Sequence, residues 1–233
     1  MKKTLTLLAL ACATNLMAQQ GFHMGVKVAP ISTWMLNQED SDAPADEFAY
    51  VSTWGLMAGA SFNYHFMDNL GVGIDVLYSA QGQKSEHAWF GDDILTLNRR
   101  LSYLKIPLLL HFNTSPAAAA QFVGYIGPQL SLLSGVKYNY YTSDSTISNS
   151  YEGDLKSFYS SSNIGIALGL GVGFSLSDAV NLNIGLRFDY DFTDAEDKEA
   201  LIEGTPFKYW PDGRPATNNL TGGLEVGLRY VLY

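Results

Sequence analysis

The chain has 233 residues and a formal net charge of −9 at pH 7, with 47% hydrophobic and 16% charged residues. The length suits a single domain, and the acidic balance argues against nucleic acid as a partner. After the first segment no run of about 18 apolar residues occurs, so the sequence predicts no membrane-spanning helix.

The sequence begins with the pattern of an export signal. Lys2 and Lys3 precede the apolar run Leu5–Ala13, which is too short to cross a bilayer. We expect a cleaved signal peptide over residues 1–18, which leaves a mature domain over residues 19–233. An uncleaved anchor is the alternative, and the shortness of the apolar run disfavours it.

Eight segments of the mature domain alternate between apolar residues and small or polar residues with a period of two. This period is typical of β-strands whose two faces meet different surroundings. In chain order the predicted strands cover Phe22–Ser32, Trp54–Phe66, Leu70–Gln81, Arg100–Phe112, Phe122–Ser134, Asn163–Phe174, Val180–Phe192 and Leu220–Leu232.

The predicted connections alternate in length. The long ones are residues 33–53, 82–99, 135–162 and 193–219, and the shorter ones are residues 67–69, 113–121 and 175–179. Long and short connections alternate in up-and-down β-barrels, which have short periplasmic turns and long outer loops. An even number of strands returns both chain ends to the periplasmic side, and closure of the sheet pairs every backbone group.

The two faces of the predicted strands differ strongly. One face is aliphatic and aromatic, whereas the other carries glycine and isolated charges, which suit the narrow interior of a small barrel. A cation facing lipid at mid-bilayer would cost about 2–4 kcal/mol, so we expect Lys27, Lys105 and Arg187 to point inward. The sequence thus predicts an all-β fold, an eight-stranded antiparallel up-and-down transmembrane β-barrel with four long outer loops.

Two prolines interrupt this pattern. Pro107 and Pro128 lie inside predicted strands, although a closed sheet has no edge where a missing N–H is harmless. We therefore expect a bulge or a weak ladder near Pro107 and Gly127.

Cations and anions share the predicted inward face. We interpret seven of them as a barrel-interior charge network, namely Lys27, Asp75, Lys105, Arg187, Asp189, Glu225 and Arg229, and Asp191 lies on the same face. A selective pore lining is the alternative, but eight strands leave an interior just wide enough for side chains. Glu225 should lie near Arg187 or Lys27, and we expect Glu225→Ala to destabilise the barrel more than Asp189→Ala.

The predicted outer loops offer weaker signals of chemistry. His87 lies beside Glu86 and near Ser85, but a lone histidine in a polar loop is usually solvated, so we expect no enzyme and no cofactor. Acidic residues gather in the first and last long loops, and without EF-hand spacing a solvated, repulsive surface is favoured over a divalent cation site. Aromatic residues near the loops, including Tyr209 and Trp210, favour an interfacial girdle over a binding surface.

Four strings of residues in the predicted strands form a recognisable set: Tyr103-Leu104-Lys105-Ile106-Pro107-Leu108-Leu109-Leu110, Gly127-Pro128-Gln129-Leu130, Gly25-Val26-Lys27-Val28-Ala29 and Gly227-Leu228-Arg229-Tyr230. With them the chain resembles the PorT-like outer-membrane β-barrel family. The resemblance covers nearly all of the mature domain and implies a location in the outer membrane of a Gram-negative bacterium. One member of that family is linked to a secretion system that exports proteins through the outer membrane.

Together these features predict a structural, surface-interaction or secretion-accessory role. A narrow, porin-like channel for small solutes is the alternative, and an outer-leaflet lipid-modifying enzyme is a more distant one. The expected partners are outer-membrane lipid, the barrel-insertion machinery, and other envelope or secretion proteins.

Overall fold

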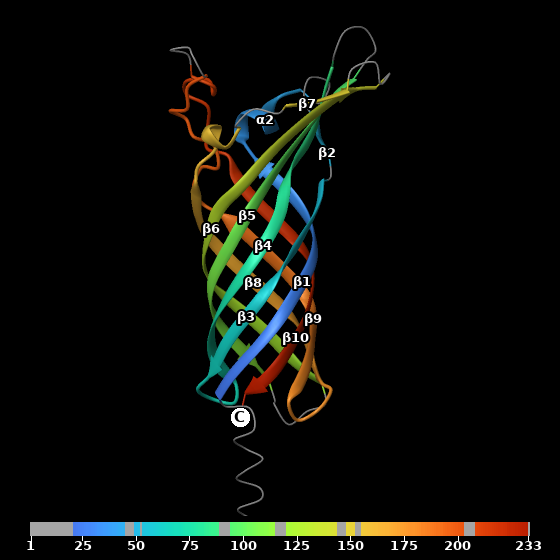
Figure 1. Ribbon diagram of the computed structural model, residues 1–233, viewed down its shortest axis with the longest axis vertical. Coiled ribbons are helices and arrows are strands. Elements are labelled where there is room, and N and C mark those ends of the chain that lie inside the picture. Colours follow the sequence, from blue (N-terminus) through green and yellow to red (C-terminus); the bar gives the residue numbers. More distant parts are fainter. Residues whose placement is uncertain are drawn as a thin grey trace, which may run out of the picture.

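The computed structural model describes residues 21–44, 49–51, 53–88, 94–114, 120–143, 148–151, 155–202 and 208–232. The predicted signal peptide lies outside these residues. The described chain forms a tall, closed barrel with the C-terminus at one end (Figure 1). Its long strands are β1 (Gly21–Leu36), β3 (Thr53–His65), β4 (Leu70–Ala88), β5 (Ile94–Asn113), β6 (Ala120–Thr142), β8 (Ser162–Ser175), β9 (Val180–Asp191) and β10 (Asn218–Leu232).

The eight long strands form one antiparallel ring. They pair in the order β1, β3, β4, β5, β6, β8, β9 and β10, and β10 pairs back with β1. Two short strands, β2 (Ala49–Val51) and β7 (Ser148–Tyr151), add to β4 and β6. The ring confirms the predicted eight-stranded, up-and-down barrel, in which every long strand has a partner on both sides.

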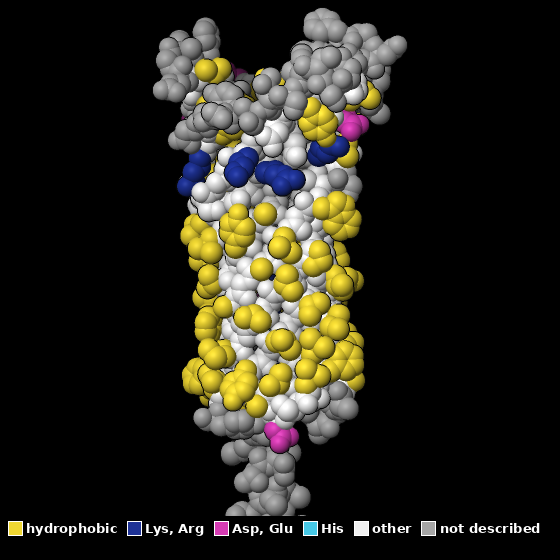
Figure 2. All heavy atoms as spheres, turned by 45° about the vertical axis from the view of Figure 1, so that its right-hand side comes forward, with side chains coloured by type: hydrophobic (Ala, Val, Ile, Leu, Met, Phe, Trp, Pro, Cys, Tyr) yellow, Lys and Arg dark blue, Asp and Glu magenta, His cyan; other side chains and the backbone are white. Residues whose placement is uncertain are grey.

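Apolar side chains cover the outside of the barrel. Figure 2 shows them as a band around the wall, with a row of Lys and Arg side chains above the band on this face. Outward residues such as Val26, Leu108 and Leu186 are exposed, whereas the side chains of Lys105 and Arg187 are only 1% exposed. Such a wall requires a lipid environment. Among the described residues, helices are too short or too polar to cross a membrane.

The barrel has two different ends. At the turn end, the chain reverses within residues 66–69 and 176–179. At the loop end, β4, β5 and β6 have 19, 20 and 23 residues and rise above the other strands (Figure 1). Short helices, α2 (Gln38–Asp42) and η1 (Lys156–Phe158), also lie at this end.

The prediction that residues 82–99 form a loop is wrong. Residues 82–88 of β4 pair with residues 94–100 of β5, and β6 similarly continues to Thr142. These extensions lie above the apolar band, where neither face meets lipid. The alternation of apolar and polar residues is therefore weak there, and the sequence gives no clear strand signal.

The ladder is weak where the prolines predict it. Between β5 and β6, Pro107 pairs with Gln129 and Leu110 pairs with Ile126. Residues 108–109 of β5 and 127–128 of β6, which lie between these pairs, do not pair with each other. The strands approach closely here, since a Cβ at Gly127 would clash with the carbonyl oxygen of Leu108. The register shift itself occurs elsewhere, between Ser102 and Tyr103.

Candidate functional site

A cluster of charged side chains crosses the barrel interior. Six of the seven predicted network residues come together in it: Lys27 from β1, Asp75 from β4, Lys105 from β5, Arg187 and Asp189 from β9, and Glu225 from β10. These strands lie on different sides of the ring, so their inward side chains meet across the lumen. We call these six residues the charge cluster.

Arg187 is the centre of the charge cluster. Its Nη1 lies 3.5 Å from Asp75 Oδ2 and 3.2 Å from Glu225 Oε2, and its Nη2 lies 3.0 Å from Asp189 Oδ1. Nη2 also donates to Gln129 Oε1 at 3.2 Å. A guanidinium has five donors in a planar fork, which lets one side chain contact three carboxylates from three strands.

Two lysines complete the charge balance. Lys27 Nζ lies 2.9 Å from Asp75 Oδ2 and 3.6 Å from Glu225 Oε1, as expected from the neighbouring strands of Lys27 and Glu225. Lys105 Nζ lies 3.2 Å from Asp189 Oδ2. With three cations and three anions the charge cluster is formally neutral, a condition under which buried charges are tolerated.

Hydrogen bonds extend the charge cluster toward both ends of the barrel. On one side the Tyr125 hydroxyl donates to Glu225 Oε2 at 2.9 Å. On the other side Asp191, a predicted inward anion, accepts from Ser131 Oγ at 3.2 Å and from Asn219 Nδ2 at 3.4 Å. The polar contacts therefore continue along the lumen above and below Arg187.

Arg229 is not part of the charge cluster, which corrects the sequence prediction. Its Nε is buried without a hydrogen-bond partner, and among the described residues no carboxylate lies within ion-pair distance of it. Arg229 follows Glu225 by four residues on β10, which is about 13 Å along a strand. Period-two alternation correctly predicts the inward face, but it does not specify height within the barrel.

An apolar core lies at the loop end of the barrel. We call it the cap; its buried residues are Met35, Leu101, Tyr103, Leu133, Leu155, Phe158, Tyr159, Ala195, Ala200 and Trp210. Trp210 Nε1 donates to the carbonyl oxygen of Phe158 at 2.8 Å, and the Phe158 ring stacks on Tyr209 at 3.9 Å. Trp210 is 7% exposed, so its assignment to an interfacial girdle is wrong.

An arginine joins the two acidic loops. Arg214 Nη2 lies 2.9 Å from Asp40 Oδ2, and its Nε lies 2.9 Å from Glu196 Oε2. Burial alone would lower the pKa of Arg214, but its hydrogen bonds to Asp40 and Glu196 outweigh burial and raise that pKa. The expectation of a merely solvated, repulsive acidic surface is therefore wrong here. The described residues contain no His, Cys, Asp and Glu group able to hold a metal ion.

Ser85 and His87 form a hydrogen-bonded pair on β4 rather than in a loop. Ser85 Oγ lies 3.2 Å from His87 Nε2, but Ser85 is buried. Glu86 occupies the intervening position, and its carboxylate lies 3.7 Å from Lys84 Nζ. A nucleophile needs access to substrate, and the burial of Ser85 denies its hydroxyl that access.

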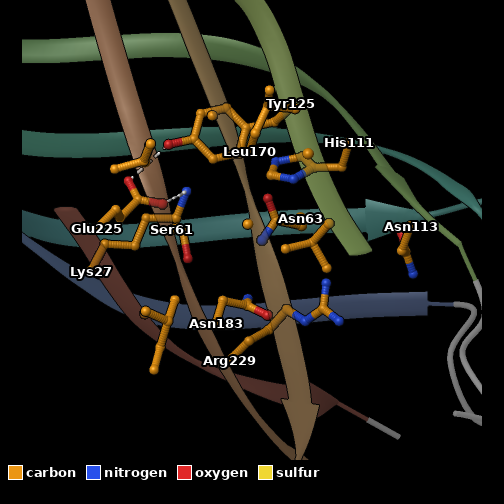
Figure 3. A pocket seen from close by; sticks show the side chains of 18 of the residues that line it. Lys27, Ser61, Asn63, His111, Asn113, Tyr125, Leu170, Asn183, Glu225 and Arg229 are labelled. Carbon is orange, nitrogen blue, oxygen red and sulfur yellow. Dashed lines mark hydrogen bonds and ion pairs between the residues drawn. The ribbon is translucent and has the colours of Figure 1, made fainter. Parts of the chain in front are cut away.

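A cavity that the sequence did not predict lies between the charge cluster and the turn end (Figure 3). Its wall includes Lys27, Tyr125 and Glu225 of the region just described, together with Arg229. Inward glycines such as Gly169 and Gly227 leave this space. They are the one sequence signal that could have indicated it.

Comparisons with known proteins agree with a barrel of the outer membrane. A family model described as "Outer membrane protein beta-barrel domain" matches residues 15–196. Among solved structures, Neisserial surface protein A shares 14% identity over 91% of this chain and 98% of that one, with a TM-score of 0.45. OprG from Pseudomonas aeruginosa shares 15% identity over 92% of this chain and 98% of that one, with a TM-score of 0.46.

Ail of Yersinia pestis is similar at 12% identity over 91% of this chain and 99% of that one, with a TM-score of 0.41. Identities and scores this low assign no function. No curated protein matches the chain.

Proposed function

The chain belongs to the outer membrane protein β-barrel domain family, and on that premise we propose that it is a non-conducting surface module. Its barrel anchors a capped loop end in the outer membrane, where the cap interacts with other envelope proteins. Two groups of contacts in the barrel interior support this proposal, namely the ion pairs of the charge cluster and the apolar packing of the cap.

The contacts of the charge cluster argue against a channel for small solutes. A path through the lumen would have to separate Arg187 from carboxylates on several strands. The cavity near the turn end has Lys27, Tyr125 and Glu225 in its wall, so it ends at the charge cluster.

The resemblance to the PorT-like family supports an accessory role in secretion or envelope assembly. Leu201 and Ile202 are 54% and 43% exposed beside the cap, and Tyr209 is partly exposed near them. Exposed apolar residues on a soluble surface often mark contact sites for other proteins. We further propose export by the signal peptide at residues 1–18, insertion by the barrel-insertion machinery, and contact with outer-membrane lipid.

We assign no catalytic activity to the chain. The burial of Ser85 and the contact of Glu86 with Lys84 support this assignment, because a hydrolase would need an accessible nucleophile.

Single-channel recording of the refolded mature protein in a planar bilayer tests the closed lumen. With insertion verified independently, we expect a silent bilayer. Stable, reproducible conductance steps would contradict the proposal and favour the channel.

A pull-down from outer membranes tests the surface role. We expect a stoichiometric envelope partner that is lost with Leu201→Ser combined with Ile202→Ser. Ile94→Ser, which also replaces an exposed apolar residue at the loop end, is the matched control and should retain the partner. Equal recovery with both variants would show that the partner does not bind this part of the cap.

A further inference from the structure

The cavity near the turn end is large enough for more than one water molecule. It encloses about 50 Å³, whereas a single water needs about 10–15 Å³. The polar residues that line it include Lys27, Asn63, His111, Tyr125, Asn183 and Arg229. A Cβ at Gly169 would clash with the Tyr125 ring, so glycine is needed where the cavity meets that side chain.

Arg229 is a buried cation that has no counter-charge in the part of the chain that the structure describes. It is 8% exposed, and its Nε has no hydrogen-bond partner. Lys27, Lys105 and Arg187, the cations of the charge cluster, each have a carboxylate within 4 Å. Burying a charge is costly unless it is paired and hydrogen-bonded, and the described residues provide no anion for Arg229.

Further polar groups around Arg229 also lack partners. In Figure 3, Arg229 lies next to Asn183 and reaches into the space near Asn63 and His111. His111 Nε2, Asn63 Oδ1 and Asn183 Oδ1 are buried and have no hydrogen-bond partner. The two asparagine atoms are amide oxygens, which accept hydrogen bonds, whereas the His111 ring can present an N–H donor at Nε2. A ring N–H near a guanidinium can bind an oxyanion together with it.

Among the described residues of the cavity wall, Glu225 is the one carboxylate, and it already has partners. Glu225 accepts from Tyr125 and pairs with Lys27 and Arg187, and Figure 3 shows Tyr125 and Lys27 directed toward it. The opposite part of the wall, at Arg229, therefore holds the unbalanced positive charge of the cavity.

We propose that this cavity binds a small oxyanion with two acceptor oxygens, of the size of formate or nitrate, and that Arg229 is its charged ligand. The planar guanidinium matches two oxygens of such an anion with parallel hydrogen bonds, while the Nε2–H group of His111 supplies a further contact. The anion enters from the turn end, because the charge cluster blocks the lumen on the other side.

Titration of the refolded mature protein with sodium formate in nonionic detergent tests the proposal. Ionic strength is held constant with sodium gluconate, whose anion is too large for the cavity. The readouts are the NMR resonance of the Arg229 Nε–H group and the thermal unfolding midpoint. We expect a saturable shift of the resonance and a rise of the midpoint, since a ligand that binds only the folded state stabilises it.

Variants separate the cavity from other cationic sites. Arg229→Gln should abolish the rise of the midpoint, and Arg229→Lys, which keeps the charge but loses the fork, should weaken formate binding at least tenfold. Arg100→Gln removes an exposed arginine outside the cavity and should leave binding unchanged. If Arg229→Gln does not fold, the lysine variant carries the test. The absence of a saturable effect in the unsubstituted protein, or an unchanged affinity in Arg229→Lys, would overturn the proposal and leave a cavity filled with water.

Discussion

Among the described residues, Asp189 is the only carboxylate within 4 Å of the Lys105 ammonium group, from which it lies 3.2 Å away. Glu225, by contrast, shares both of its cations with other anions: Lys27 also pairs with Asp75, and Arg187 also pairs with Asp75 and Asp189. The charge cluster is therefore asymmetric, because one of its anions has no substitute.

This asymmetry reverses the ranking that the sequence suggests. We expect Asp189→Ala to lower the free energy of unfolding by about 3–5 kcal/mol, because it leaves Lys105 buried without a partner. Glu225→Ala should cost less. Urea unfolding of both variants in the same detergent measures the difference. Replacing both partners, with Lys105→Met and Asp189→Leu, should restore most of the loss, and a larger loss for Glu225→Ala would contradict this account.

Arg214 should hold the cap together. In Arg214→Gln, Asp40 and Glu196 lose their shared cation, and charge-assisted hydrogen bonds of this kind contribute about 1.5–3 kcal/mol. We expect faster hydrogen exchange at the Asp197 amide, which donates to the carbonyl oxygen of Phe158. Lys208→Gln, which removes a cation paired with the exposed Glu199, is the control and should leave this exchange unchanged.

Two inward glycines should respond differently to substitution. A Cβ at Gly169 would clash with the Tyr125 ring, whereas a Cβ at Gly227 would lie 3.4 Å from Lys27 Cγ, an ordinary contact. We therefore expect Gly169→Ala to reduce the folded fraction and Gly227→Ala to be tolerated. The heat-dependent shift of the folded barrel in gel electrophoresis measures both, and equal folded fractions would argue against tight packing at Tyr125.

Arg100 and Lys137 pair directly across β5 and β6 on the outside of the barrel, and both are exposed. Like charges in this arrangement destabilise a sheet, by up to about 1 kcal/mol. Arg100→Gln should therefore raise the unfolding free energy in nonionic detergent. In vesicles with phosphate-bearing anionic lipid the gain should disappear, because each cation near such a surface is stabilised by about 1 kcal/mol.

Lys84→Gln is the control for this comparison, since Lys84 Nζ lies 3.7 Å from the Glu86 carboxylate. Lys84→Gln should not raise the unfolding free energy in detergent. If Arg100→Gln raises the unfolding free energy equally in detergent and in anionic vesicles, lipid phosphate does not neutralise the repulsion between Arg100 and Lys137.

The sequence predicts the strands well where one face meets lipid. The alternation in β9, with Leu182, Ile184 and Leu186 outward, follows directly from that contact, and Arg187 is inward by the same period. Above the apolar band the alternation weakens, so it does not predict the extensions of β4, β5 and β6. Contacts between loops, such as Arg214 with Asp40, depend on tertiary proximity over 174 residues of chain, which no local pattern carries.

The sequence predicts that the charged residues of the candidate site face the barrel interior, but it does not predict their level along the barrel axis. Lys27, Asp75 and Glu225 share a level because the shear of the barrel brings them together, and shear is not visible in the alternation of residues. Arg229 has the correct parity and a different level, so it faces the cavity instead of the charge cluster. The cavity itself arises from glycines on several strands, whose combined effect appears only in the closed ring.

The ring closes by pairing the first long strand, β1, with the last, β10. Contacts between the two ends of a chain have the largest loop-closure entropy, so this step should be late and slow in folding. Before β1 and β10 pair, Lys27 and Glu225 lie on strands that are not in contact. An open sheet in lipid would therefore leave both charges with fewer ion-pair partners. The barrel is thus built to insert as a nearly complete sheet, and a chain that lacks β10 should fail to assemble rather than form a shorter barrel.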